Sequence, residues 1–156
     1  WNTSTNASRD AAIDVGRSSQ RFKDLYLSGG AYLGGTAAAN KLDDYEEGSF
    51  VTTSGVGLTI QYFNYTKIGR LVFVSADVTI ASSSSGSTFY MSLPFASNVT
   101  SYGGGAISYH TNSSYANMSL NVESNIKFRS SNQVSNLSYA NMAGVRVIFN
   151  AVYQSN

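Results

Sequence analysis

Residues 71–81, LVFVSADVTIA, decide which fold we expect for this chain. Every second residue from Val72 to Ile80 is apolar, in the order Val, Val, Ala, Val and Ile. Side chains of a β-strand point alternately to the two faces of a sheet, so this pattern predicts a strand with one buried face. β-Branched residues fill most of these positions, and such residues pack well on a pleated surface.

The same period of two recurs along the chain from residue 50 onward. The last such segment is apolar at many positions of both faces, which predicts a central place in a sheet or a place at a subunit contact. Turn residues separate the segments, among them the three glycines 103–105. We therefore expect a mainly β head, an antiparallel β-sandwich of the jelly-roll type. The expected strands are 50–53, 58–65, 71–81, 88–93, 104–109, 117–123, 125–129 and 144–153.

The composition excludes several classes of protein. The chain of 156 residues has no cysteine, so it can form neither disulfides nor thiolate metal sites. A net charge of +1 gives no electrostatic case for nucleic acid, whose binders usually carry a basic patch. Only 12% of the residues are charged, and Ser, Thr, Asn, Gly and Tyr are frequent. Such uncharged, hydrogen-bonding surfaces are typical of exported β proteins, virion fibres and sugar-binding modules.

Residues 1–47 lack the period of two. Their apolar residues come in short groups, such as Phe22, Leu25 and Leu27, separated by glycine-rich stretches. No group can bury itself, because an isolated hairpin is only marginally stable in water. We expect this segment to form a stalk or collar by packing against copies of itself around an axis, and residues 48–156 to form the head. Since the sequence starts at Trp1, we also expect it to be a piece of a longer protein.

Four acidic residues gather in NKLDDYEEGSF, residues 40–50, where stalk and head would join. They are Asp43, Asp44, Glu46 and Glu47. A glycosidase needs two carboxylates held across a cleft, and adjacent residues of an extended segment point to opposite sides. A calcium site needs about six to eight oxygen ligands, usually from a loop of alternating acids. We therefore expect a solvated junction whose acids meet Lys41 or a basic residue of a neighbouring chain.

Hydrogen-bonding side chains and flexible glycines also gather in SYGGGAISYHTNSSY, residues 101–115. Tyrosine and asparagine combine apolar surface with hydrogen-bonding groups, which suits sugars and protein epitopes alike. We expect a binding site here, although the alternative that these tyrosines fill the core or line a trimer axis stays open. The candidate residues are Tyr102, Tyr109, His110, Asn112 and Tyr115.

His110 is the only histidine, so a single chain cannot build a zinc site. Three copies could meet on a threefold axis, and a metal there stays an open alternative. A Ser-His-Asp triad would need His110 beside one of very few acids, and no nucleophile elbow is present. No glycine-rich stretch has a phosphate-binding pattern. We expect no cofactor, no catalysis, and His110 in an exposed loop.

Two stretches carry a resemblance to a known family. They are IDVGRSSQRFKDLYLSGGAYLGGT, residues 13–36, and the acidic stretch that follows it. Together they resemble a module near the C-terminal ends of tail fibre and tail-tip proteins of tailed bacteriophages, many of them marine or cyanobacterial. Arg17 is an extra or shifted residue relative to that module, and Gly48-Ser49-Phe50 replaces its Gly-Thr-Trp. YTKIGRLVFVSADVTI, residues 65–80, is similar to a strand common in the heads of such fibres.

The resemblance implies a homotrimeric, non-catalytic fibre tip of the virion, in which a threefold stalk leads into a head that touches the cell. Its partners would be a host surface glycan or outer-membrane protein, and other tail proteins through a missing N-terminal part. Two alternatives stay open. One is a purely structural fibre, collar or decoration protein. The other is a polysaccharide depolymerase with an active site shared between chains, since Asp77 and Glu123 are the only acids of the head beyond the junction.

Overall fold

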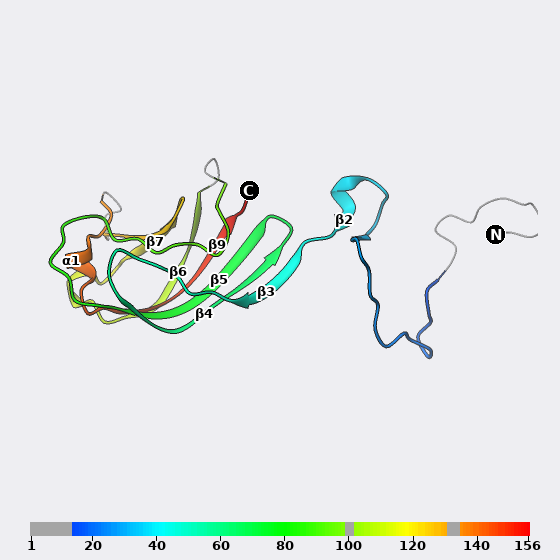
Figure 1. Ribbon diagram of the computed structural model, residues 1–156, viewed down its shortest axis with the longest axis horizontal. Coiled ribbons are helices and arrows are strands. Elements are labelled where there is room, and N and C mark those ends of the chain that lie inside the picture. Colours follow the sequence, from blue (N-terminus) through cyan, green and yellow to red (C-terminus); the bar gives the residue numbers. More distant parts are fainter. Residues whose placement is uncertain (1–13, 99–101, 131–134) are drawn as a thin grey trace, which may run out of the picture.

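Nine strands form two antiparallel sheets in the part of the chain that the computed structural model describes, residues 14–98, 102–130 and 135–156 (Figure 1). The larger sheet has seven strands in the order β3-β4-β5-β9-β6-β7-β8, and the smaller sheet pairs β1 with β2. The expected mainly β architecture is confirmed. The strands are β1 (Ala31–Tyr32), β2 (Lys41–Leu42), β3 (Tyr45–Ser49), β4 (Leu58–Ile68), β5 (Leu71–Ile80), β6 (Gly103–His110), β7 (Ser119–Val122), β8 (Ile126–Arg129) and β9 (Arg146–Gln154).

Within the described residues, helical structure is confined to single turns between the strands. The turns are η1 (Ala38–Asn40), η2 (Ser113–Tyr115) and α1 (Tyr139–Met142). None of the helices in the described ranges is long and apolar enough to cross a membrane.

Six of the eight predicted strands are confirmed as β4, β5, β6, β7, β8 and β9, with small differences at their ends. The central place predicted for the last strand is confirmed as well, because β9 pairs with β5 on one side and with β6 on the other. Neighbouring strands therefore pair the backbone groups along both of its edges.

Segments 50–53 and 88–93 are not strands, so these two predictions are wrong. They carry isolated hydrogen bonds instead of a ladder. Met91 exchanges two backbone hydrogen bonds with β8, of 3.0 and 2.9 Å, and the Ser92 amide donates to the Thr53 carbonyl at 2.9 Å. The Ser92 hydroxyl accepts the Thr53 amide at 2.8 Å, so a side chain takes a donor that a ladder would use.

The seven-stranded sheet curls around its core. Phe149 of β9 and Phe128 of β8 are three strands apart in sheet order, which would separate them by about 14 Å in a flat sheet. Their ring centroids are only 5.7 Å apart. Phe63 of β4 lies 6.3 Å from Phe149, and Phe89 stacks on Phe128 at 5.9 Å. All four rings are almost completely buried, so the inner face of the curled sheet forms one aromatic and aliphatic core.

Part of the acidic stretch forms strand β3, which the sequence pattern did not predict. Its five residues pair antiparallel with β4, from Tyr45 opposite Ile68 to Ser49 opposite Asn64. All five residues are exposed, so the strand has no buried apolar face and leaves no period of two to detect. The expected boundary between residues 47 and 48 lies within this strand.

Gly103, Gly104 and Gly105 begin strand β6, so the prediction that they form a turn is wrong. A Cβ atom on Gly105 would lie 1.8 Å from the Asn150 carbonyl oxygen of β9, and one on Gly103 would lie 2.4 Å from the Val152 carbonyl oxygen. These glycines therefore allow β6 to approach β9 closely, which is a second use of glycine besides turns.

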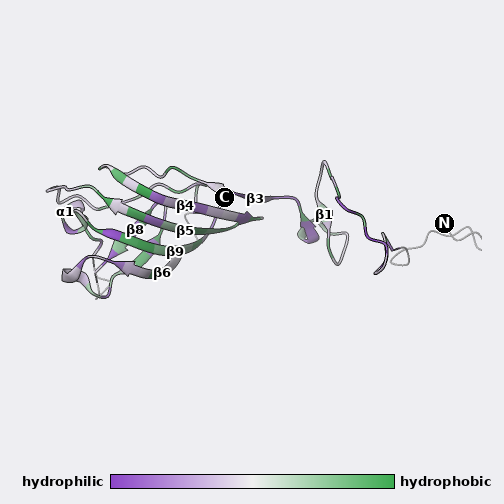
Figure 2. Cartoon of the chain, turned by 90° about the horizontal axis from the view of Figure 1, so that it is seen from below, coloured by the Kyte–Doolittle hydropathy of each residue, from purple (hydrophilic) through white to green (hydrophobic). Residues whose placement is uncertain are grey.

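Residues 14–44 form an arm that leads away from the seven-stranded sheet (Figures 1 and 2). None of its residues is buried within the chain. This agrees with the short apolar groups in its sequence, none of which can make a core. The arm's large apolar side chains that are exposed are Val15, Phe22, Leu25, Tyr26, Leu27, Tyr32, Leu33 and Leu42.

Candidate binding surface

The outer face of the curled sheet, opposite the core, carries one row of large side chains across four neighbouring strands. The strand register places Tyr62 of β4 beside Asp77 of β5, Asp77 beside Ile148 of β9, and Ile148 beside Tyr109 of β6. Arg146 of β9 joins the row through an ion pair with Asp77. We call Tyr62, Asp77, Tyr109 and Arg146 the Tyr–Arg platform.

Arg146 donates two hydrogen bonds to the Asp77 carboxylate. Its Nε donates to Oδ1 at 3.0 Å, and its Nη2 donates to Oδ2 at 2.6 Å. Asp77 is only 4% exposed, whereas the Arg146 side chain is 46% exposed, so the guanidinium lies at the surface over the carboxylate. The hydrogen bonds from Arg146 lower the pKa of Asp77, and those to Asp77 raise the pKa of Arg146. The phenols of Tyr109 and Tyr62 lie within electrostatic reach of the guanidinium.

Two β-bulges aim the tyrosines of the platform outward. The register shifts between Ile60 and Tyr62 in β4, and between Ile107 and Tyr109 in β6. Without the shifts, each tyrosine would follow the preceding isoleucine onto the inner face, since a slip of one residue exchanges the two faces. Instead Tyr62 is 38% exposed and Tyr109 is 49% exposed. Bulges are frequent next to functional sites, where they redirect a side chain.

Only one of the five candidate binding residues, Tyr109, lies on this platform. Tyr102 is 74% exposed but precedes the other end of β6, seven residues from Tyr109, which is about 23 Å along a strand. The structure therefore does not bring these two tyrosines together.

The other three candidates lie at the end of β6 and in the loop that follows. His110 ends β6 and is half-buried, so its expected place in an exposed loop is wrong; its Nε2 lies 3.3 Å from the Ala116 carbonyl oxygen. Asn112 is buried, caps η2 and donates to the Asn141 carbonyl at 2.8 Å. The Tyr115 hydroxyl accepts a hydrogen bond from the Asn141 amide at 2.9 Å. Asn112 and Tyr115 thus tie this loop to α1.

Sequence reasoning missed three members of the platform: Tyr62, Asp77 and Arg146. One signal was available. Asp77 is the only charged residue of β5, and Arg146 is the only charged residue of β9. Charges at outward positions of two central strands need a partner, and they can supply one to each other when the strands pair.

The opposite end of the outer face is apolar and lies near the arm. Ile68 pairs with Leu71, and Phe73 pairs with Val152. These four side chains are 40–51% exposed, and Tyr45 of β3, opposite Ile68, is 60% exposed. We call these five residues the apolar band. Uncharged side chains separate it from the platform: Asn64, Ser75 and Asn150.

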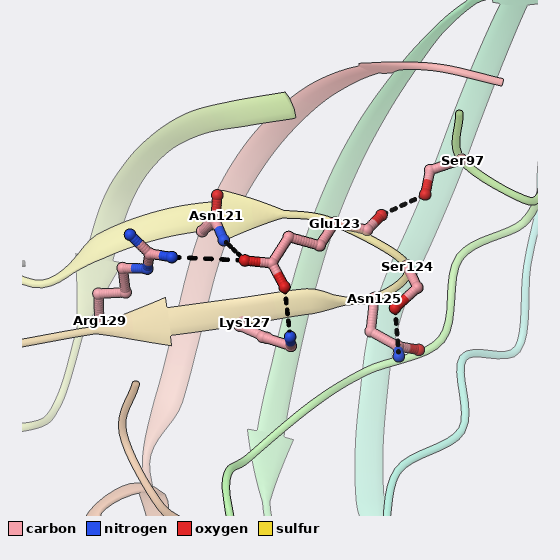
Figure 3. A network of polar contacts seen from close by, with 7 residues as sticks. All are labelled: Ser97, Asn121, Glu123, Ser124, Asn125, Lys127 and Arg129. Atoms are coloured by element: carbon pink, nitrogen blue, oxygen red, sulfur yellow. Dashed lines mark hydrogen bonds and ion pairs between the residues drawn. The ribbon is translucent and has the colours of Figure 1, made fainter. Parts of the chain in front are cut away.

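A second polar network lies on the hairpin of β7 and β8 (Figure 3). The Glu123 carboxylate accepts hydrogen bonds from Lys127 at 2.5 Å and from Asn121 at 2.7 Å, and pairs with Arg129 at 3.4 Å. The Glu123 backbone carbonyl accepts a hydrogen bond from the Ser97 hydroxyl. The hydrogen bond from Lys127 is the main cause that lowers the pKa of Glu123. The network ties the hairpin together and to residue 97.

A Glu123→Gln variant tests this network through the pH dependence of stability. Because the pKa of Glu123 is lower in the folded state, its stabilisation is present above the ordinary glutamate pKa and is lost as the pH falls through the folded value. We expect the variant to lose about 1 kcal/mol of unfolding free energy at pH 7, and little at pH 3. Urea unfolding at both pH values measures this; Glu47→Gln on the exposed β3 is the control. Equal losses at the two pH values would contradict the assignment.

The acids of the junction are paired and solvated, as expected. Asp43 forms an ion pair with Lys41 at 2.9 Å, and this hydrogen bond lowers its pKa. Asp44 pairs with Lys67 of β4. Glu46 accepts a hydrogen bond from Tyr65 at 2.6 Å. Two of these partners lie on β4, so the stretch is anchored to the sheet as well as solvated.

The described residues contain no group of three or more histidine or acidic side chains placed to share a metal ion. Comparison with protein-family models, with curated proteins and with solved structures found no match for this chain.

Proposed function

We propose that this chain is the tip of a bacteriophage tail fibre, which binds a host cell-surface receptor without catalysis and acts as a homotrimer on the virion. The observation that carries the proposal is the pairing of two unlike parts. A folded β head presents two half-exposed tyrosines and an arginine, and it is joined to an arm without any buried residue. The resemblance of residues 13–50 to tail fibre ends supports the same conclusion.

The arm supports the proposed trimer. Its apolar side chains, such as Phe22 and Leu25, are exposed by 70% and 74% in a single chain. Exposed apolar surface of this kind favours association with further copies, and closed symmetry would cover every copy equally. The apolar band on the head lies at the same end of the sheet and offers further surface to a neighbouring copy.

The carboxylates of the head support a non-catalytic role. Asp77 accepts hydrogen bonds from Arg146, and Glu123 accepts one from Lys127. These hydrogen bonds lower the pKa of both carboxyl groups. A glycosidase needs one carboxyl group whose pKa is raised, so that it can donate a proton to the leaving group. Neither head carboxylate has that environment.

The fold supports the finer architecture that we propose for the head, a jelly-roll-like sandwich. Hydrogen bonds lead from the edge strand β8 to segment 88–93 and on to Thr53, and Phe50 bonds to Phe63 of β4, so these segments bridge the two sides of the curled sheet around its core. With three heads on one fibre and several fibres on one particle, weak single contacts would add up to firm adsorption.

Two measurements on the purified chain test the proposal. We expect a trimer in size-exclusion chromatography with light scattering, and saturable binding of the labelled chain to some strains in a panel of marine and cyanobacterial cells. A monomer that binds no strain would overturn the proposal. Binding only to another virion protein would favour a structural role, and release of reducing ends from a bound polysaccharide would favour a depolymerase.

A further inference from the structure

We propose that the Tyr–Arg platform binds an uncharged glycan, with Tyr62 and Tyr109 stacking on sugar rings and Arg146 donating hydrogen bonds to sugar hydroxyls. This inference rests on the proposed receptor-binding function and names the ligand class of that site. Asp77 is a positioning residue: it is buried beneath the guanidinium and acts on the ligand through Arg146.

The charge of the platform favours a neutral ligand. The two hydrogen bonds between Arg146 and Asp77 occupy one side of the guanidinium and balance its charge. A carboxylated or sulfated sugar would have to compete with Asp77 for the arginine. The next positions along the outer face are the uncharged Asn64, Ser75 and Asn150, which suit hydroxyl groups. These three side chains carry no charge that would attract an anion.

The shape of the platform favours a chain of sugars. Tyr62 and Tyr109 lie on β4 and β6, which are three strand spacings apart, or about 14 Å measured along the curved sheet. Each tyrosine is exposed by less than half, so part of its surface is covered and part is free. Rigid aromatic surfaces with hydrogen-bonding groups between them match the alternating C–H and hydroxyl groups of an oligosaccharide.

The two bulges strengthen this assignment. An aromatic side chain gains more by burial in the core than by exposure, and both tyrosines follow an inward-facing isoleucine. Each bulge interrupts the ladder and turns its tyrosine outward, on opposite sides of the same arginine. Regular pairing is thus interrupted in both β4 and β6, and both interruptions place a tyrosine on the same platform.

The test is an array of purified bacterial polysaccharides with neutral and acidic members, probed with the full chain. We expect binding to neutral members that is unchanged between ~0.05 and ~0.5 M NaCl, since no net charge is screened. Tyr62→Ala and Tyr109→Ala should each weaken it about tenfold or more. Tyr90→Ala, at 39% exposure a matched tyrosine, and Tyr102→Ala should change it less than about twofold.

The Asp77→Asn variant should change which polysaccharides are bound, an effect that the loss of a merely structural residue would not produce. Without the Asp77 carboxylate beside it, Arg146 should bind acidic members of the array in a salt-sensitive manner. Binding to neutral members should weaken. Circular dichroism checks that each variant folds. The salt dependence of binding is measured on the unchanged chain, so it tests the proposal even if a variant fails to fold. Preference of that chain for acidic members, or equal binding by the Tyr62, Tyr109 and Tyr90 variants, would overturn the glycan site. Binding to cells but to no polysaccharide would also overturn it, yet leave receptor binding intact with a protein as receptor.

Discussion

The Gly105→Ala variant is expected to lose about 3 kcal/mol or more of unfolding free energy. A Cβ atom at this position would lie 1.8 Å from the Asn150 carbonyl oxygen and 2.8 Å from the Ala151 Cα atom. Both are backbone atoms of the central strand β9, so no side-chain rotation can relieve the clash. The strands β6 and β9 would have to separate, and β6 lies between β9 and the hairpin of β7 and β8 in the hydrogen-bonded order of the described sheet.

Gly104→Ala is the matched control, because a Cβ atom there would lie 3.6 Å from its nearest neighbour, an ordinary contact distance. We expect its stability to stay within about 1 kcal/mol of the unchanged chain. Urea unfolding followed by circular dichroism measures both variants. Similar stabilities for the two alanines would show that β6 does not approach β9 as described.

The Phe149→Ala variant is expected to lose about 3–5 kcal/mol of unfolding free energy. Phe149 is fully buried on the central strand, and its ring packs edge-on against Phe63 and Phe128. Removing it would open a cavity where the two halves of the curled sheet meet. A loss of this size is a large part of the stability of a small domain, so much of the protein would be unfolded near its working temperature.

Phe149→Leu provides a graded comparison in the same unfolding experiment. Leucine fills most of the volume and keeps the apolar surface, so we expect a clearly smaller loss than with alanine. If alanine and leucine cost the same small amount, the centre of the core would lie elsewhere.

Much of the sheet could be predicted because alternation is a local signal. Val72, Val74, Val78 and Ile80 mark the inner face of β5 without any knowledge of the strands beside it. The apolar residues on both faces of segment 144–153 likewise predicted a central strand. Strand β3 could not be found in this way, because its exposed residues are held in place by β4 and not by a core.

The candidate site was only partly predictable, because its members come together through the fold. Asp77 and Arg146 are 69 residues apart in sequence, and no local pattern joins them. Tyr109 was found from composition, but the bulge that decides which face it takes is a property of the pairing between β6 and β9. Asn112 has the same hydrogen-bonding chemistry as a binding residue, yet the fold uses it to cap a turn.

The point where the arm enters the head has a mechanical consequence. The arm continues directly into β3, so it joins the sheet at the end of that strand where Tyr45 lies (Figures 1 and 2). Tension on the arm therefore acts along β3 and loads its hydrogen bonds to β4 in shear, so that the five residue pairs resist together instead of opening one by one. A pull on the arm would strain this short ladder first, ahead of the core and the Tyr–Arg platform.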